Sequence, residues 1–168
     1  MYINSKRLIL LINSVVLEEN VMEKKFFVAV KALLCFDGKI LLIKRTKEAR
    51  GDYYRWEFPG GRLEFGEKPV QALERELLEE IGVTFTSTKL LHAWNFYKNE
   101  YTEVVGLTYM CKISSDKIVL SKEHDNYAWV LREELNNYRL VDGLMQQINE
   151  YDWDYINNFM NMDDEADG

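Results

Sequence analysis

Three glutamates lie within five positions in the segment RELLEEIG, residues 75–82. An α-helix turns by about 100° per residue, so Glu76, Glu79 and Glu80 would project from one narrow helix face. Like charges one turn apart repel by roughly 0.2–0.5 kcal/mol per pair in isolated helices. The residues alone therefore leave two interpretations open, a solvated acidic face balanced by salt bridges or a cradle for a cation.

The ligand chemistry of such a cradle indicates a hard cation. Side chains that offer only oxygen suit Mg²⁺ or Mn²⁺ better than zinc, and a bound ion of this kind can polarise a phosphoryl oxygen or activate water. Arg75 lies one turn before Glu79, where it can hold that carboxylate by a charge-assisted hydrogen bond. Gly60 and Gly61 lack a Cβ atom, so the backbone there can approach a metal or phosphate closely.

A longer pattern surrounds the glutamates. From residue 61 to residue 83 the chain reads GRLEFGEKPVQALERELLEEIGV, with Glu67 six positions after Gly61 and RELLEEIG beginning eight positions after Glu67. This spacing resembles the Nudix box, and the preceding WEFPGG (56–61) resembles the MutT branch of that family. The resemblance implies an α/β/α sandwich with a mixed central sheet and favours the cation cradle.

The resemblance also implies roles for individual residues. It implies metal ligation, of Mg²⁺ or Mn²⁺, by the Gly60 carbonyl, Glu76, Glu79 and Glu80. It implies that Glu67 supports the loop or a metal-bound water, and the catalytic residues expected are Glu79, Glu80, Glu123, Glu67 and Arg75. One departure is Lys68 before Pro69, where the family often has a capping Ser or Thr; a missing cap costs about 1 kcal/mol.

The family usually takes one more acidic group from a downstream loop. In KEHDNYAW (122–129), Glu123 lies six residues before Trp129, a spacing similar to that in MutT, and we expect Glu123 to be an extra ligand or the general base. A glutamate of the box is the alternative base. His124 is the next candidate because its pKa lies near working pH, although a surface imidazole is the simpler interpretation. Glu103, within a strand, is a weaker rival.

The candidates for substrate binding precede and follow the box. Basic residues could contact the phosphates, and the candidates are Arg45, Arg55 and Arg62, although a solvated position is the simpler interpretation for most of the basic residues. Aromatic residues such as Trp94 and Phe96 could stack on a base, although positions in the core or on the sheet are the simpler interpretation.

The implied reaction is hydrolysis of the pyrophosphate bond in a nucleoside diphosphate linked to X. WEFPGG favours a nucleoside triphosphate, including an oxidised one, cleaved to monophosphate and pyrophosphate. Dinucleoside polyphosphates and ADP-ribose or a nucleotide sugar are alternatives, as is a Nudix module that senses a nucleotide without cleaving it. Tyr101, eighteen residues after Val83, hints weakly at the dinucleoside polyphosphates.

The elements that must position these residues can be predicted from local pattern. Two apolar runs around Asp37-Gly38 predict a hairpin, Pro69 suits a first helical position, and Gly82 suits a helix end. We expect strands at 26–36, 39–45, 83–97, 101–113 and 127–131, a turn-rich segment at 56–67, and helices at 69–81 and 143–160.

Charge and composition bound the partners. The net charge is −7, and residues 150–168 contain seven acids and no Lys or Arg, so the rest of the chain is balanced. Without a basic stripe we expect no binding to nucleic acid, and we expect a small-molecule nucleotide as partner. The domain boundaries expected are 1–22 for an N-terminal extension, 23–160 for the Nudix domain and 161–168 for an acidic tail.

Export and membrane insertion are not expected. Lys6-Arg7 before LILLINSVVL faintly resembles a signal peptide, but no small-residue cleavage site follows, and the run is too short to span a bilayer. Cys35 and Cys111 show no metal spacing, so we expect buried free thiols, which suit a reducing cytoplasm. A homodimer is left open.

Overall fold

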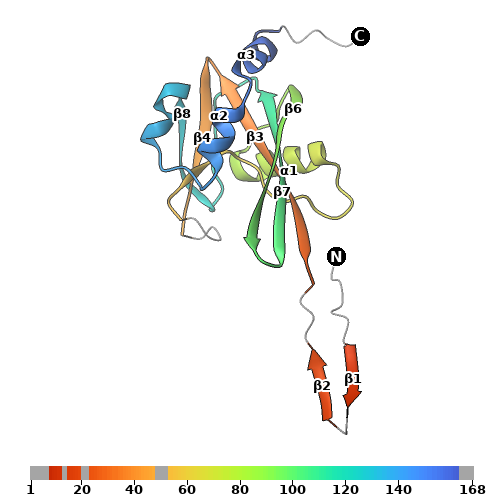
Figure 1. The fold of residues 1–168 in the computed structure, drawn as a ribbon. Helices are drawn as coiled ribbons and strands as arrows, with labels where there is room; N and C mark the ends of the chain where they lie inside the picture. Colours follow the sequence, from red (N-terminus) through yellow and green to blue (C-terminus); the bar gives the residue numbers. More distant parts are fainter. Residues whose placement is uncertain (1–7, 13–14, 20–22, 48–52, 163–168) are drawn as a thin grey trace.

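A computed structural model describes residues 8–12, 15–19, 23–47 and 53–162 (Figure 1). Its main sheet has six strands, in chain order β3 (Lys25–Phe36), β4 (Lys39–Arg45), β5 (Trp56–Glu57), β6 (Ser87–Asn99), β7 (Thr102–Lys112) and β8 (His124–Val130). The strand order is β5-β4-β3-β7-β6, with β8 paired to β4. β3 and β7 are parallel and the other pairs antiparallel, so the sheet is mixed, as expected.

The predicted hairpin is present, but its strands soon separate. β3 and β4 pair only at their turn, through Cys35 with Ile40 and Phe36 with Lys39. Beyond it, the segment that follows β5 takes the free edge of β3. The Val30 N–H donates to the Gly61 carbonyl at 2.8 Å and the Ala32 N–H donates to the Pro59 carbonyl at 2.9 Å. Residues 59–61, which we call the glycine loop, are thus inserted between β3 and β4 in the middle of the sheet.

Helices cover both faces of the sheet and complete an α/β/α sandwich (Figure 1). Helix α1 (Pro69–Ile81) packs on one face through four fully buried residues, Ala72, Leu73, Leu77 and Ile81. The 3₁₀ helix η1 (Arg132–Asn137), α2 (Leu144–Glu150) and α3 (Trp153–Asn161) pack on the other face. Burying each large apolar side chain stabilises the fold by about 1.5–3 kcal/mol, so α1 is held firmly against the sheet.

Helix α1 has the bounds that the sequence predicts. Pro69 is its first residue, and Gly82 ends it in the left-handed conformation with φ of 67°. The missing Ser or Thr cap is partly replaced, because the Lys68 N–H donates to Gln71 Oε1 at 3.0 Å. Val70, the second residue of the helix, is 39% exposed.

The C-terminal part differs from the prediction of one helix over 143–160. Two helices form there, and Asp152 separates them, because its side chain accepts the Tyr155 N–H at 2.9 Å and so caps α3. Helix α3 occupies much of the acidic end of the chain, and residues 163–168 of the expected tail lie outside the described residues.

The N-terminal part contains strands that the sequence analysis did not assign. Strands β1 (Leu8–Ile12) and β2 (Val15–Glu19) pair antiparallel in a separate two-stranded sheet. Among the described residues, no helix is both long and apolar enough to cross a membrane.

Candidate functional site

The glycine loop meets the acidic face of α1 at Gly60. The Gly60 N–H donates to Glu80 Oε2 at 2.7 Å. The backbone φ of Gly60 is +123°, and a Cβ atom there would lie 2.3 Å from the Val30 carbonyl oxygen. Only glycine fits this position, which fixes the loop between β3 and the helix.

Gly61 brings the second carboxylate against the loop. A Cβ atom on Gly61 would lie 2.4 Å from Cδ of Glu76 and 2.5 Å from both carboxylate oxygens. The Glu76 carboxylate therefore occupies the space that any other residue at position 61 would fill. The two glycines and the two glutamates form one tightly fitted unit.

Arg75 braces the acidic face. Its guanidinium donates to both oxygens of Glu67, at 2.8 and 3.0 Å, to Glu76 Oε1 at 2.9 Å and to Glu79 Oε2 at 3.3 Å. Hydrogen bonds from Arg75 and from the Glu64 N–H lower the pKa of Glu67 to about 2. The predicted Arg75–Glu79 contact is present, and the same side chain also orients Glu67 and Glu76.

Exposure separates the three box glutamates. The side chains of Glu76 and Glu80 are 15% and 14% exposed, whereas that of Glu79 is 61% exposed. Burial raises the pKa of Glu80 to about 7, although Lys31, His124 and the Gly60 N–H act in the opposite direction. Glu79 is thus the carboxylate that is most open to an incoming ligand.

Behind the loop lies a buried polar cluster that we call the Glu57 cluster, formed by Glu57, Lys31, Arg45 and His124. Glu57 is 4% exposed. Its carboxylate accepts from Lys31 Nζ at 2.7 Å and from Arg45 Nη1, and it lies 3.6 Å from His124 Nε2. Burial opposes ionisation, yet these neighbours hold the pKa of Glu57 well below its usual range.

His124 connects this cluster to the box. It is 4% exposed, and its Nε2 lies 3.9 Å from Glu80 Oε1. The interpretation of His124 as a surface imidazole is therefore wrong, and β8 begins at this residue rather than at 127.

The other two acidic candidates are Glu123 and Glu103. Glu123 is exposed and its carbonyl accepts the Thr46 N–H at 2.9 Å, while Glu103 accepts from Asn95 Nδ2 at 2.7 Å.

The three candidate arginines have different surroundings. Arg45 lies in the Glu57 cluster. Arg55 is bonded to the Leu140 carbonyl and to Asp142, beyond η1. The Arg62 guanidinium lies 4.4 Å from the ring centroid of Phe27. Each of the three guanidinium groups therefore has a protein contact of its own.

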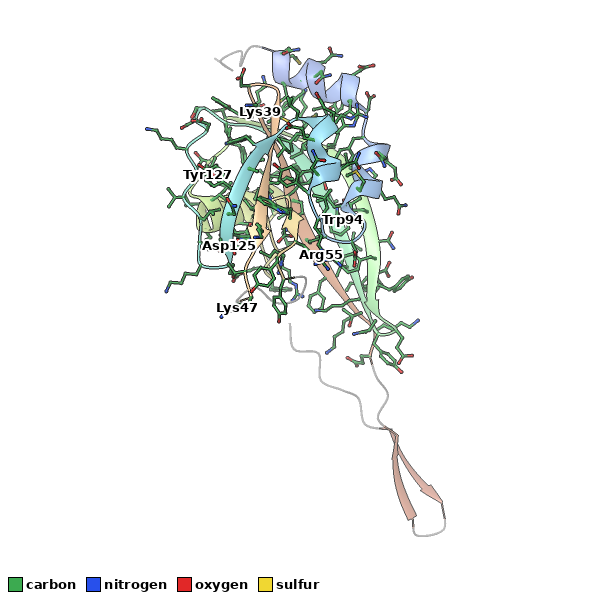
Figure 2. All side chains as sticks on the ribbon, turned by 90° about the vertical axis from the view of Figure 1, so that its left-hand side faces the viewer. Lys39, Lys47, Arg55, Trp94, Asp125 and Tyr127 are labelled. Carbon is green, nitrogen blue, oxygen red and sulfur yellow. The ribbon has the colours of Figure 1, made fainter. Side chains whose placement is uncertain are left out.

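An aromatic surface lies on the sheet face that carries α2 and α3. Trp94 lies flat on β7, because a Cβ atom on Gly106 would lie 2.1 Å from its ring. Its indole N–H donates to Thr108 Oγ1 at 3.0 Å, and its ring stacks on Phe96 with centroids 6.0 Å apart. Figure 2 shows Trp94 on β6, on the side of these helices. In the sheet register Gly106 is the neighbour of Ala29, two residues before Lys31, so this surface borders the Glu57 cluster.

Sequence reasoning missed Lys31 and Glu57. Lys31 is the only charged residue in the apolar run 26–36, and Glu57 is the only charged residue in WEFPGG. A charge inside a strand pattern is a signal for a buried partner, because buried charges are almost always paired. The partner itself could not be read, since the two residues are 26 positions apart.

The donor set fits a hard cation on chemical grounds. Among the described residues, no three Asp, Glu, His or Cys side chains already converge as a metal cluster. However, the carboxylates of Glu76 and Glu80 flank Gly60 and Gly61, and all the groups offered are oxygens. A positive group already lies at this point, because Lys31 Nζ donates to the Gly60 carbonyl at 2.6 Å.

Fold and site together define a hydrolase of the Nudix class. The family model for the NUDIX domain matches residues 25–151, and the chain belongs to this family. It is an enzyme of the pyrophosphohydrolase type.

Two relatives are similar to this chain in sequence. The chain is 32% identical over 115 residues to a MutT-like protein of Streptomyces ambofaciens, covering 64% of this chain and 70% of that protein. It is 30% identical over 115 residues to nucleoside triphosphatase NudI of Escherichia coli, covering 62% of this chain and 81% of that protein.

Solved structures agree with this fold. The MutT protein from Methanosarcina mazei has a TM-score of 0.63 at 27% identity, covering 82% of this chain and 94% of that chain. The E. coli ORF135 protein has a TM-score of 0.64 at 26% identity, covering 83% of this chain and 96% of that chain.

Proposed function

We propose that this protein hydrolyses a nucleoside triphosphate, including oxidised forms, to the monophosphate and pyrophosphate with Mg²⁺ or Mn²⁺. The observation that carries the proposal is the hydrogen bond from the Gly60 N–H to Glu80. It joins the loop that a phosphate can approach to the acidic face of α1. The similarity to NudI and to a MutT-like protein supports the choice of a triphosphate.

The metal would be held by the Gly60 carbonyl, Glu76, Glu79 and Glu80. When bound, it would neutralise phosphate charge and make an attacking water more acidic. Arg75 fixes the carboxylates of Glu76 and Glu79 through its hydrogen bonds. Such preorganisation, rather than covalent chemistry, supplies most of the catalysis in phosphoryl transfer.

The proton acceptor is assigned to Glu123 or to a glutamate of the box. Glu123 is exposed on the segment that leads into β8, directly before His124, which contacts the site. Glu79 is the alternative because its carboxylate is the most exposed of the three in the box. A Glu123→Gln variant that keeps full turnover would transfer this role to the box.

The nucleoside would bind over the aromatic surface of Trp94 and Phe96, and Arg45, Arg55 and Arg62 would face its phosphates. Stacking on an aromatic ring contributes about 1–3 kcal/mol per base. Gly106→Ala tests this arrangement without touching the carboxylates, because the new Cβ would displace the Trp94 ring. We expect KM to rise about tenfold with little change in kcat.

The deciding experiment is an assay of pyrophosphate and phosphate release over a nucleotide panel with Mg²⁺ or Mn²⁺. The panel contains the four common nucleoside triphosphates, oxidised triphosphates, a dinucleoside polyphosphate and ADP-ribose. We expect a triphosphate to be the best substrate, with pyrophosphate as product. Nucleotide binding without cleavage of any member would instead indicate a sensing module.

The bounds of the domain and the cellular location are proposed as well. We propose that residues 23–160 form the Nudix domain. The free thiols of Cys35 and Cys111 support a location in the reducing cytoplasm.

A further inference from the structure

The Gly60 carbonyl already has a cationic partner. Lys31 Nζ donates to it at 2.6 Å and to Glu57 Oε2 at 2.7 Å. The Lys31 side chain is only 18% exposed and the Glu57 side chain 6%. A lysine this enclosed is held by its partners, because an unpaired buried ammonium is costly.

These contacts form a closed circuit around Gly60. Glu80 accepts a hydrogen bond from the Gly60 N–H, and Lys31 donates one to the Gly60 carbonyl. Glu57 binds Lys31, and His124 lies between Glu57 and Glu80 at 3.6 and 3.9 Å. The peptide groups on both sides of Gly60 are therefore fixed by side chains, and the position of Lys31 depends on Glu57.

A divalent ion bound to the Gly60 carbonyl oxygen would compete with the Lys31 ammonium for that oxygen. A divalent ion and an ammonium that share a carbonyl oxygen would lie within about 4 Å of each other, where like charges repel strongly in a partly buried site. A lysine side chain is long and flexible, whereas the loop is fixed on β3, so the ammonium is the group that can move.

We propose that Lys31 is a resident counter-cation that occupies the Gly60 carbonyl in the metal-free enzyme and withdraws when a divalent ion binds there. The inference rests on the proposed function, since it requires Gly60 to be a metal ligand. Glu57 keeps the withdrawn ammonium at the edge of the site, where the phosphates of a nucleotide arrive. Lys31 thus weakens metal binding in the absence of substrate and binds phosphate once metal is present.

Mn²⁺ affinity, measured by calorimetry and by the electron paramagnetic resonance of free Mn²⁺, tests this competition. Lys31→Met removes the ammonium but keeps the apolar stem, and we expect Mn²⁺ to bind at least about tenfold more tightly. The matched control is Lys112→Met. Lys112 also donates to a backbone carbonyl, that of Met162, but lies four residues beyond the partner of Lys31 on β7. We expect its affinity to equal that of the wild type.

A double variant separates competition from net charge. Lys31→Met with Glu57→Gln changes no net charge, so a purely long-range effect would return the affinity to that of the wild type. We expect the double variant to remain tight, because the carbonyl is vacated in both cases. Wild-type affinity in the double variant, or unchanged or weaker affinity in Lys31→Met, would overturn the inference but not the proposed function, which the nucleotide assay on the wild-type protein tests separately.

Crystal structures of the wild-type enzyme provide a test that does not depend on variant stability. We expect Lys31 Nζ within hydrogen-bond distance of the Gly60 carbonyl without metal, and displaced from it with Mn²⁺. An ammonium that keeps this contact beside a bound ion refutes the displacement. If wild-type protein binds no Mn²⁺ and cleaves no nucleotide, the proposed function fails as well, so the two failures are distinguishable.

Discussion

Gly61→Ala should lower the activity of the site about 100-fold and leave the fold nearly intact. The new Cβ would lie 2.4 Å from Cδ of Glu76, so the carboxylate must retreat by about 1 Å, a displacement that can cost about 100-fold in rate. The retreat is easy, because this carboxylate is the end of a flexible side chain. Weakening the Arg75–Glu76 pair should cost no more than about 1 kcal/mol of folding free energy.

Gly60→Ala is the contrasting variant one residue earlier. Its Cβ would lie 2.3 Å from the Val30 carbonyl oxygen, which is backbone and cannot turn aside, and φ there is +123°. Strain of about 1–3 kcal/mol adds to weakened hydrogen bonds between the loop and β3, worth about 1 kcal/mol each. We expect a loss of roughly 3–5 kcal/mol in stability. Gly38→Ala, with a φ of +71° and open space around it, measures the cost of the backbone conformation alone.

Urea unfolding and kcat/KM for the best nucleotide distinguish the two effects. Gly61→Ala should unfold near the wild-type midpoint with kcat/KM about 100-fold lower, and Gly60→Ala should unfold much earlier. Gly61→Ala should also add little to the loss caused by Glu76→Gln, because both act on one carboxylate. Wild-type turnover in Gly61→Ala, or equal destabilisation by both glycine variants, would refute the assigned geometry.

Four further outcomes are expected. Glu79→Gln and Glu80→Gln should each lower turnover by orders of magnitude with little change in the unfolding midpoint, and near-wild-type activity in both would remove the metal assignment. Arg75→Met should lower kcat more than it raises KM, because it frees carboxylates without touching substrate; steady-state kinetics decide this. Chelation by EDTA should stop hydrolysis, with activity restored by Mg²⁺ or Mn²⁺, whereas activity retained in EDTA would exclude the metal. The lowered pKa of Glu67 gives stability that is present above its ordinary value of 4.5 and is lost as the pH falls towards about 2; urea midpoints from pH 5 to 2 should therefore fall less steeply in Glu67→Gln than in the wild type.

Local signals predicted the elements that carry the site. The bounds of α1 follow from Pro69, Gly82 and a period of 3.6, and the bounds of β4 follow from the Asp37-Gly38 turn. The break between α2 and α3 was not predicted, because it depends on one cap by Asp152 within a pattern that is helical on both sides. Periodicity shows where a helix can form, but not where a side chain captures the backbone first.

The Glu57 cluster could not be predicted from the sequence, for a different reason. Its contacts join β3, β4, β5 and β8, which are distant in sequence, and they exist only because β3 and β4 separate after their turn. Nothing in either strand marks that separation. His124 could be named as a candidate from its type, but its burial depends on β8 pairing with β4.

Groups within the protein already compensate the charges of the box glutamates. Arg75 compensates Glu76 and Glu79, and the Gly60 N–H bonds Glu80, whose buried carboxyl has a raised pKa. Contacts within the protein therefore hold the carboxylates of the acidic face in place, and the face does not need a metal ion in order to form. Repulsion alone would have given a site that folds around its metal. The preformed face, with Lys31 at the Gly60 carbonyl, instead supports the proposal that a metal ion would replace a charge that is already present.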